Sequence, residues 1–323
     1  MRRPGLALVA ILLVAAAVVS AVVILRPGVR GGDDPAPPSG GEGLALLVVQ
    51  TAVGPFAAVI GSTGGAAGAL AIPTKISVTV PGQGDSRLDE ALALPGPTAT
   101  TTVANLLGVW VDHHAVLGRL RLEGLVDRVG GVEVAGESRT GAEVVHALET
   151  AKRGRAFAFQ LVLEALLAAN PMWNDRDFAE TSDADAVRAI LASAAGANVR
   201  TLDVIEPAEG IFRAEVAAVR EGIVDAFGGP DREVVGVIVL NGSGAPGVGE
   251  AVAEKIVPGG FSVVVSENAQ TFDHDETLVV VGSSSDVGIG SRVRDLLGVG
   301  SVNVSVSSGL ARVTIVVGKD FIG

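Results

Sequence analysis

Short hydrophobic runs alternate with longer helical patterns over most of the chain. Six runs have the length and apolar content of strands and are bounded by turn residues, at 44–50, 55–61, 69–72, 76–80, 111–117 and 132–134. Five longer segments space their apolar residues as a helix does, at 98–107, 120–129, 141–149, 157–169 and 215–227. Pro95-Gly96-Pro97 predicts a loop, and Ser182 with Asp185 predicts a capping box that opens a further helix. This mixture predicts an α/β fold.

The end of the chain has a more regular order after the turn Gly228-Gly229-Pro230, where we place a domain boundary. A Val/Ile-rich strand at 234–240 leads through Asn241-Gly242-Ser243-Gly244 into a helix. The elements that follow form the order β-α-β-β-α-β with one strand added. That order predicts a small α/β sandwich of one sheet and two helices over residues 231–323.

The N-terminal segment contains an apolar, uncharged run over residues 6–25. A helix of that length reaches about 30 Å, the thickness of a bilayer core. The run is longer than the apolar stretch of a signal peptide and no A-x-A site closes it, so an uncleaved anchor is favoured over a cleaved signal peptide. We therefore expect a transmembrane anchor at 1–26, a flexible linker at 27–43, and single-pass insertion in the plasma membrane. Arg2 and Arg3 weakly favour a cytoplasmic N-terminus, with both domains extracytoplasmic.

Charge and composition exclude several classes of function. The chain has 36 acidic residues against 24 Lys and Arg, a net charge of −12, and no basic stripe, which argues against nucleic-acid binding. It has no cysteine, which excludes disulfides, thiolate metal sites and a lipid-modified N-terminal cysteine.

Few motifs indicate chemistry. The segment 241–247 could bind an anion at a helix N-terminus, but Pro246 interrupts it and no Lys-Ser/Thr pair follows, so a tight strand-to-helix turn is the better interpretation. His274 lies in the acidic segment 273–276, where a solvated turn is favoured over a divalent-cation site. The residues alone therefore predict an anchored two-domain α/β protein without a catalytic signature.

Several segments resemble one family of cell-envelope proteins. The opening at 234–244, Gly260-Phe261-Ser262-Val263 and Gly318-Lys319-Asp320-Phe321 are similar to the LytR C-terminal domain. In the first half, Asn105-Leu106-Leu107-Gly108 and the segment 111–134 are similar to the "NLLG" and "IDYY…LVDxLGGVxV" motifs of the LytR-CpsA-Psr (LCP) domain. The resemblance implies a membrane-anchored, three-layer α/β/α LCP-like domain at 44–230, followed by the LytR C-terminal domain at 231–323.

Members of that family transfer wall polymers from a polyprenyl pyrophosphate carrier to peptidoglycan, with the lipid tail inside the domain. Such chemistry needs cations on the diphosphate and Mg²⁺ held by carboxylates, because charge builds up on the leaving phosphate. The chain departs from the family at these positions. The family's "IPRD" is Ile72-Pro73-Thr74-Lys75, an early Asp falls at Pro55-Phe56, and an Arg is replaced by Ala158.

The resemblance therefore implies a degenerate domain with no catalytic residues, no metal ligands and no cofactor; Mg²⁺ enters only if an active ligase is retained. The retained cations are Arg87 and Arg155, and Lys75 stands where the family has Asp. These three are the candidate contacts for a ligand head group, and solvated surface charge is the favoured interpretation of each.

The leading hypothesis is a catalytically inactive envelope protein that assists or regulates cell-wall assembly. Its expected partners are the membrane, through residues 6–25, and a polyprenyl-phosphate lipid, peptidoglycan or an LCP ligase. Two alternatives stay open at this point. One is an active phosphotransferase that attaches wall glycopolymers to peptidoglycan, and the other is an envelope scaffold that acts through its C-terminal domain.

Overall fold

The computed structural model describes residues 43–65, 67–152, 154–208, 211–228, 233–305 and 310–322. They belong to one compact unit spanning 38–323. The expected anchor at 6–25 lies outside the described residues, so it stays a prediction. Among the described helices, none is long and apolar enough to cross a membrane.

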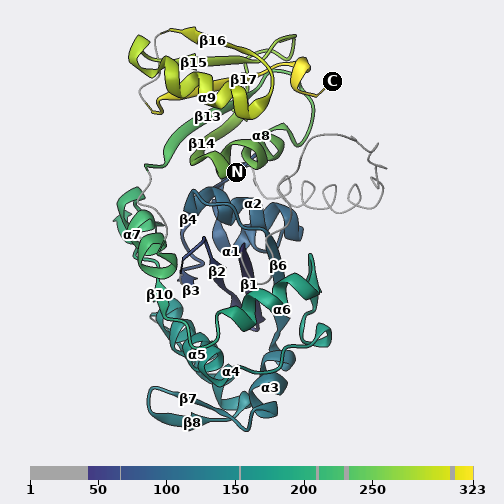
Figure 1. Ribbon diagram of the computed structural model, residues 1–323, viewed down its shortest axis with the longest axis vertical. Coiled ribbons are helices and arrows are strands. Elements are labelled where there is room, and N and C mark those ends of the chain that lie inside the picture. The colour runs from purple at the N-terminus through teal and green to yellow at the C-terminus, as the bar shows by residue number, and fades with distance from the viewer. Residues whose placement is uncertain are drawn as a thin grey trace, which may run out of the picture. The chain divides into compact units, whose positions relative to one another are not determined.

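The first sheet has six strands in the order β10-β3-β2-β1-β6-β9 (Figure 1). Its centre is an antiparallel meander of β1, β2 and β3, to which β6 and β10 add in parallel. Both faces of the three central strands are buried, so the sequence of each strand is a continuous apolar run. The strands are β1 (Gly43–Thr51), β2 (Gly54–Ser62), β3 (Gly68–Ile72), β6 (His113–Gly118), β9 (Glu180–Thr181) and β10 (Val199–Thr201).

Helices cover both faces of this sheet. Alternate residues of β1 enter two different cores: Leu46 and Val48 pack with one set of helices, Leu47 and Val49 with the other. The first set is α1 (Leu88–Ala91), α2 (Gly96–Leu107) and α7 (Val216–Phe227). The second set is α3 (Arg119–Arg128), α4 (Gly141–Thr150), α5 (Arg155–Ala169) and α6 (Ala184–Ser193). The α/β class predicted from the sequence is confirmed.

Three hairpins and one short helix complete this part of the chain. They are β4 (Ser77–Val80) with β5 (Gly84–Arg87), β7 (Val132–Val134) with β8 (Glu137–Arg139), β11 (Ile205–Ala208) with β12 (Ile211–Arg213), and the 3-10 helix η1 (Asp175–Asp177).

Two local predictions are wrong. The predicted loop at Pro95–Pro97 is the start of α2, which begins at Gly96 with Pro97 in its first turn. Proline is tolerated there because its missing N–H has no intrahelical partner in any case. The predicted capping box at Ser182 does not form; Asp183 caps α6 and accepts a hydrogen bond from the backbone N–H of Ala186 at 3.0 Å.

The second sheet has five strands in the order β14-β13-β17-β15-β16, with α8 and α9 packed against it (Figure 1). The chain order β13-α8-β14-β15-α9-β16-β17 matches the predicted sandwich with its added strand. The elements are β13 (Val235–Asn241), α8 (Val248–Ile256), η2 (Val257–Gly259), β14 (Phe261–Asn268), β15 (Leu278–Val281), η3 (Ser284–Asp286), α9 (Val287–Leu297), β16 (Ser301–Val304), β17 (Val313–Val317) and η4 (Lys319–Phe321).

A buried asparagine on α2 joins the second sheet to the first half of the chain. Asn105, only 2% exposed, donates from Nδ2 to the carbonyl of Val263 at 2.9 Å and accepts from the N–H of Val263 at 2.6 Å. Val263 lies on the edge strand β14, so one side-chain amide satisfies both of its outward backbone groups as a neighbouring strand would. One hydrophobic core runs from Leu44 to Val317 through this contact.

The β4–β5 hairpin also lies against β14. The N–H of Gly82 donates to Ser266 Oγ at 2.7 Å, and Thr79 Oγ1 donates to the carbonyl of Val264 at 3.3 Å. A side chain at Gly249 would meet the backbone nitrogen of Gly82 at 2.3 Å, so the close approach of α8 to the hairpin requires glycine there. The domain boundary expected near residue 230 stays a prediction, because one hydrophobic core includes residues from both sides of it.

We predict that Asn105→Ala lowers the free energy of unfolding by about 3 kcal/mol, because it leaves the buried N–H and carbonyl of Val263 unpaired. Urea unfolding of the full chain measures this loss, and amide hydrogen exchange at Val263 localises it. The matched control is Asn303→Ala, an exposed asparagine on β16. An equal loss in both variants would contradict the role given to Asn105.

A second buried polar pair joins α3 to η1 in the first half of the chain. Asp177 is 4% exposed, and its two carboxylate oxygens accept hydrogen bonds from the two terminal guanidinium nitrogens of Arg128, at 2.5 and 3.0 Å. Burial acts to raise the pKa of Asp177, but the hydrogen bonds from Arg128 and from the backbone of Asn174 bring it below its ordinary value. A carboxyl with a depressed pKa stabilises the fold above the pKa of the unfolded chain, and that contribution is lost as the pH falls through the folded value.

We therefore expect Arg128→Ala to reduce stability by about 1–2 kcal/mol at neutral pH, a range that allows for the partial exposure of Arg128. The difference from the unmodified chain should shrink below about pH 4, where Asp177 is protonated in the unfolded chain. Urea unfolding at pH 7 and pH 3 measures both values. A difference that is the same at the two pH values would refute the assignment.

Candidate functional site

Four segments meet where β2 begins and β3 ends. Thr74, just after β3, donates from Oγ1 to the carbonyl of Pro55 at 3.1 Å, and its own carbonyl accepts the N–H of Asp89 at 2.7 Å. Arg155, the first residue of α5, donates to the carbonyl of Val53 at 2.9 Å. The tertiary structure thus gathers the turn before β2, the turn after β3, the start of α1 and the start of α5.

The guanidinium of Arg155 is held on an aromatic surface at this point. Its central carbon lies 4.5 Å from the ring centre of Phe56, which contacts Phe159 at 5.4 Å between ring centres. Burial lowers the pKa of Arg155, and the carboxylate of Asp89 opposes that shift. An arginine packed over a ring, with one donor used by a carbonyl, has fewer donors left for a ligand.

Arg87 is paired within the same site. Its Nε donates to Asp89 Oδ1 at 3.0 Å, and a second nitrogen pairs with the other carboxylate oxygen. The Arg87 side chain is 49% exposed and that of Asp89 is 19% exposed. The charge of Asp89 therefore acts on both arginines, one through a bidentate pair and one through space.

Of the three cations singled out from the sequence, the structure brings Arg87 and Arg155 together around Asp89. Lys75 is exposed in the turn that follows β3, next to Thr74. Asp89 was missed in the sequence, although the Arg87-x-Asp89 spacing at the start of a helix was visible there. An acidic residue in a first helical turn normally indicates helix stabilisation, so the spacing alone gave no reason to place it in a site.

The donor set does not fit Mg²⁺ coordination. Magnesium prefers several oxygen ligands in octahedral geometry, and Asp89 is already paired with Arg87. Across the described residues, no three His, Asp or Glu side chains are grouped closely enough to hold a metal ion. We therefore assign no step to a metal at this site.

The core behind Arg155 is densely filled. Phe56, Phe159, Val162 and Leu163 are each 3% exposed or less, and they pack against the same face of the first sheet. Arg87, Arg155 and Lys75 are absent from the lining of each of five prominent cavities in the described part of the chain. A cavity of about 140 Å³ lies on the opposite face of the sheet, beside Leu46 and His114.

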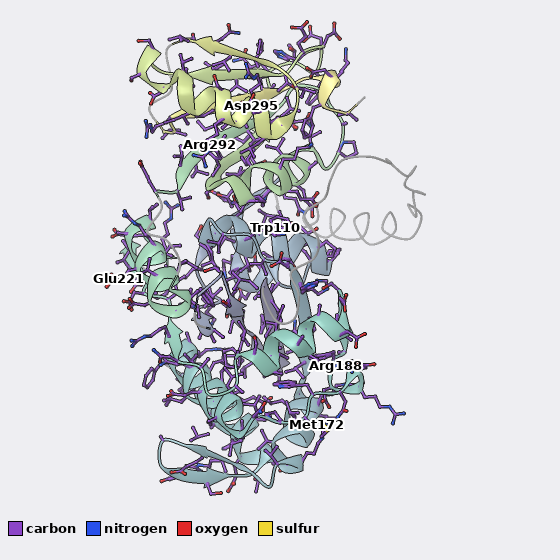
Figure 2. All side chains as sticks on the ribbon, viewed as in Figure 1. Trp110, Met172, Arg188, Glu221, Arg292 and Asp295 are labelled. Atoms are coloured by element: carbon purple, nitrogen blue, oxygen red, sulfur yellow. The ribbon has the colours of Figure 1, made fainter. Side chains whose placement is uncertain are left out.

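Two further cavities contain residues marked in Figure 2. One of about 450 Å³ lies at Met172 and Arg188, but Arg188 is paired with Asp175 and Asp185. The other, of about 240 Å³, lies beside Trp110. Neither presents a free cation of the kind that a diphosphate needs.

The two other segments singled out in the sequence are held by internal contacts. Asn241 Oδ1 accepts the N–H groups of Ser243 and Gly244 at 3.2 and 3.0 Å, and Asn241 Nδ2 donates to the carbonyl of Ala245 at 2.8 Å. In the acidic turn around His274, Asp275 pairs with Lys319 at 2.8 Å. Both arrangements agree with turns rather than with anion or cation sites.

Comparison with known families matches residues 234–321 to the family described as "LytR cell envelope-related transcriptional attenuator". A curated relative, the "Probable cell wall biosynthesis protein LcpB" of Corynebacterium glutamicum, is 41% identical over 66 residues, which are 20% of this chain and 16% of the relative. The chain therefore spans only a small part of that relative's length.

Similar solved structures cover a larger share of the chain. They include a transcriptional regulator of Enterococcus faecalis, with 15% identity over 58% of this chain and 88% of that chain, at a TM-score of 0.47. They also include the LytR-CPS2A-psr family protein YwtF (TagT) of Bacillus subtilis with bound octaprenyl pyrophosphate lipid. It shares 18% identity over 57% of this chain and 89% of that chain, at a TM-score of 0.45.

The predicted resemblance to the LytR C-terminal domain is confirmed, because the chain carries this domain at 234–321. This match and the curated relative support a relationship to the LytR-CpsA-Psr (LCP) family over the segments that they cover.

We predict that Asp89→Asn strengthens the binding of inorganic pyrophosphate about five-fold. Removing one negative charge about 4 Å from a guanidinium in a solvated site is worth about 1 kcal/mol. Isothermal titration calorimetry at low salt measures the change. The control is Asp85→Asn, the same charge change on the adjacent strand β5; equal gains in both variants would show a general charge effect and not a local one.

Proposed function

We propose that this chain is a non-catalytic protein of the cell envelope that assists wall assembly by binding a wall component or a partner ligase. The observation that carries the proposal is the bidentate pairing of Asp89 with Arg87, together with the charge that Asp89 exerts on Arg155. Transfer from a pyrophosphate carrier needs positive charge directed at the leaving phosphate. Here a carboxylate neutralises one guanidinium, and a carbonyl and an aromatic ring engage the other.

The packing behind the site supports a ligand bound at the surface. A polyprenyl tail needs an open apolar channel next to the head-group cations, and Phe56 and Phe159 fill that space. Among the expected partners, this favours peptidoglycan or a partner ligase over an inserted lipid. A lipid head group at Arg87, Arg155 and Lys75 remains part of the proposal only as a surface contact.

The proposal keeps the chain at the plasma membrane. The apolar run at 6–25 serves as a single-pass anchor, with the N-terminus in the cytoplasm and residues 44–230 and 231–323 outside, where wall assembly takes place. The curated relative's name supports a link to cell wall biosynthesis, over the segment that the two proteins share.

A second candidate is an active phosphotransferase with a rearranged site. It is favoured by one observation: the charge of Asp89 acts on both Arg87 and Arg155, so the two cations belong to one local site. Binding of a diphosphate would then have to displace Asp89 from Arg87.

The two functions are separated by a transfer assay. The full chain in liposomes is incubated with a polyprenyl-pyrophosphate-linked glycan, Mg²⁺ and peptidoglycan. An active LCP ligase in a separate reaction is the positive control. We expect no transfer above the rate without protein, together with retention of the full chain on isolated walls or on the ligase.

Three variants test whether any turnover depends on the candidate site. They are Arg87→Ala, Arg155→Ala and, as control, Arg200→Ala, at an exposed arginine on β10. Turnover that is abolished by the first two substitutions and kept by the third would establish the phosphotransferase and overturn the non-catalytic proposal.

A further inference from the structure

A cavity of about 670 Å³ lies at the carboxyl ends of β13 and β14. These strands are parallel, and β13 has β14 on one side and β17 on the other. Open α/β sheets commonly bind ligands in the crevice outside the carboxyl ends of their strands, at points where the connections of neighbouring strands run to opposite faces of the sheet. The turn Gly82–Gly84 of the β4–β5 hairpin closes one side of the cavity.

The polar lining of this cavity is almost neutral. Gln83 and Asn268 are exposed, and within the described part of the chain neither side chain has a hydrogen-bond partner. Each amide can donate and accept. The charged residue in the lining is Glu267, and no Lys or Arg of the described chain contributes to it. This composition disfavours phosphates and other anions.

One aromatic side chain adds an apolar surface. Phe272 is 50% exposed, although it lines the cavity. Its position is fixed by close packing on the glycine loop, because a Cβ at Gly244 would lie 3.1 Å from the Phe272 Cβ. A ring held in this way offers a flat face beside hydrogen-bonding amides.

The walls of the cavity are preorganised. The side chain of Asn241 closes the loop at 243–245, and Gly82 is tied to Ser266 at 2.7 Å. A cavity whose walls are already ordered loses little entropy when a ligand enters.

We propose that this cavity binds a neutral saccharide. A sugar presents hydroxyl groups that both donate and accept, which matches the amides of Gln83 and Asn268, and C–H faces that pack on an aromatic ring such as Phe272. An acidic peptide would be repelled by Glu267 and by the net charge of −12. The assignment of the saccharide to a wall glycan rests on the proposed function; saccharide binding itself does not.

The test is ligand-observed saturation-transfer NMR on the full chain, with two neutral probes, triacetylchitotriose and maltotriose, at about 10 mM. We expect saturation of at least one probe and a Kd that rises roughly five-fold in Phe272→Ala. Asn268→Ala should weaken binding as well. The matched control is Phe157→Ala, a phenylalanine that is 56% exposed on α5 and outside the cavity lining.

The absence of saturation with both probes would overturn the proposal, and so would equal binding by all variants. Tighter binding of an acidic pentapeptide than of either sugar would replace it with a peptide site. Thermal unfolding confirms that each variant is folded. The result does not depend on the transfer assay, because a saccharide can bind whether or not the chain transfers polymer, and transfer can fail while the saccharide binds.

Discussion

The amide of Asn105 binds both outward backbone groups of Val263, and the arrangement of the two sheets depends on this contact. An edge strand normally exposes unpaired N–H and C=O groups that invite association with another chain. Here the groups at Val263 are covered from within, and apolar side chains of both halves pack around them. The β4–β5 hairpin is thereby held against β14, which in turn forms the wall of the cavity at Gln83 and Asn268.

The residues that carry the family resemblance mostly serve the fold. Asp112 accepts the N–H of Leu44 at 2.9 Å, and Asp127 accepts the N–H of Gly141 at 2.7 Å at the start of α4. At the end of the chain, Thr277 donates to Asp320 at 2.7 Å and accepts the N–H of Gly318 at 3.0 Å. Each contact satisfies a backbone group or an ionised side chain that would otherwise lie unpaired. Two positions that differ from the family, Thr74 and Lys75, lie instead in the turn after β3, beside the candidate site.

A fold and a charged binding site differ in how many residues each depends on. Packing and backbone pairing depend on many residues, whereas charge stabilisation of a leaving phosphate depends on a few groups in fixed positions. At the candidate site, Thr74 makes a hydrogen bond to the backbone, and Asp89 supplies a negative charge beside Arg87. The site is internally satisfied, which is a stable arrangement for the protein and a poor one for binding a second anion.

The sequence by itself determined the class of fold and its longer elements, but not the short helix α1 or the short strands β5 and β8 to β12. Apolar periodicity and turn residues act over a few positions, so the strands β1 to β3 and the end of α2 at Gly108, where φ is 65°, could be predicted locally. The start of α2 and the cap of α6 were misjudged because proline and serine have more than one compatible position near a helix N-terminus.

Only the tertiary structure decided the rest. The pairing of Asn105 with Val263 spans 158 residues, and the charge of Asp89 acts on an arginine from α5. The cavity combines a hairpin of the first half with strand ends of the second. Contacts of this kind have no local periodicity, because they follow from how whole elements pack and which buried polar groups are left to be paired.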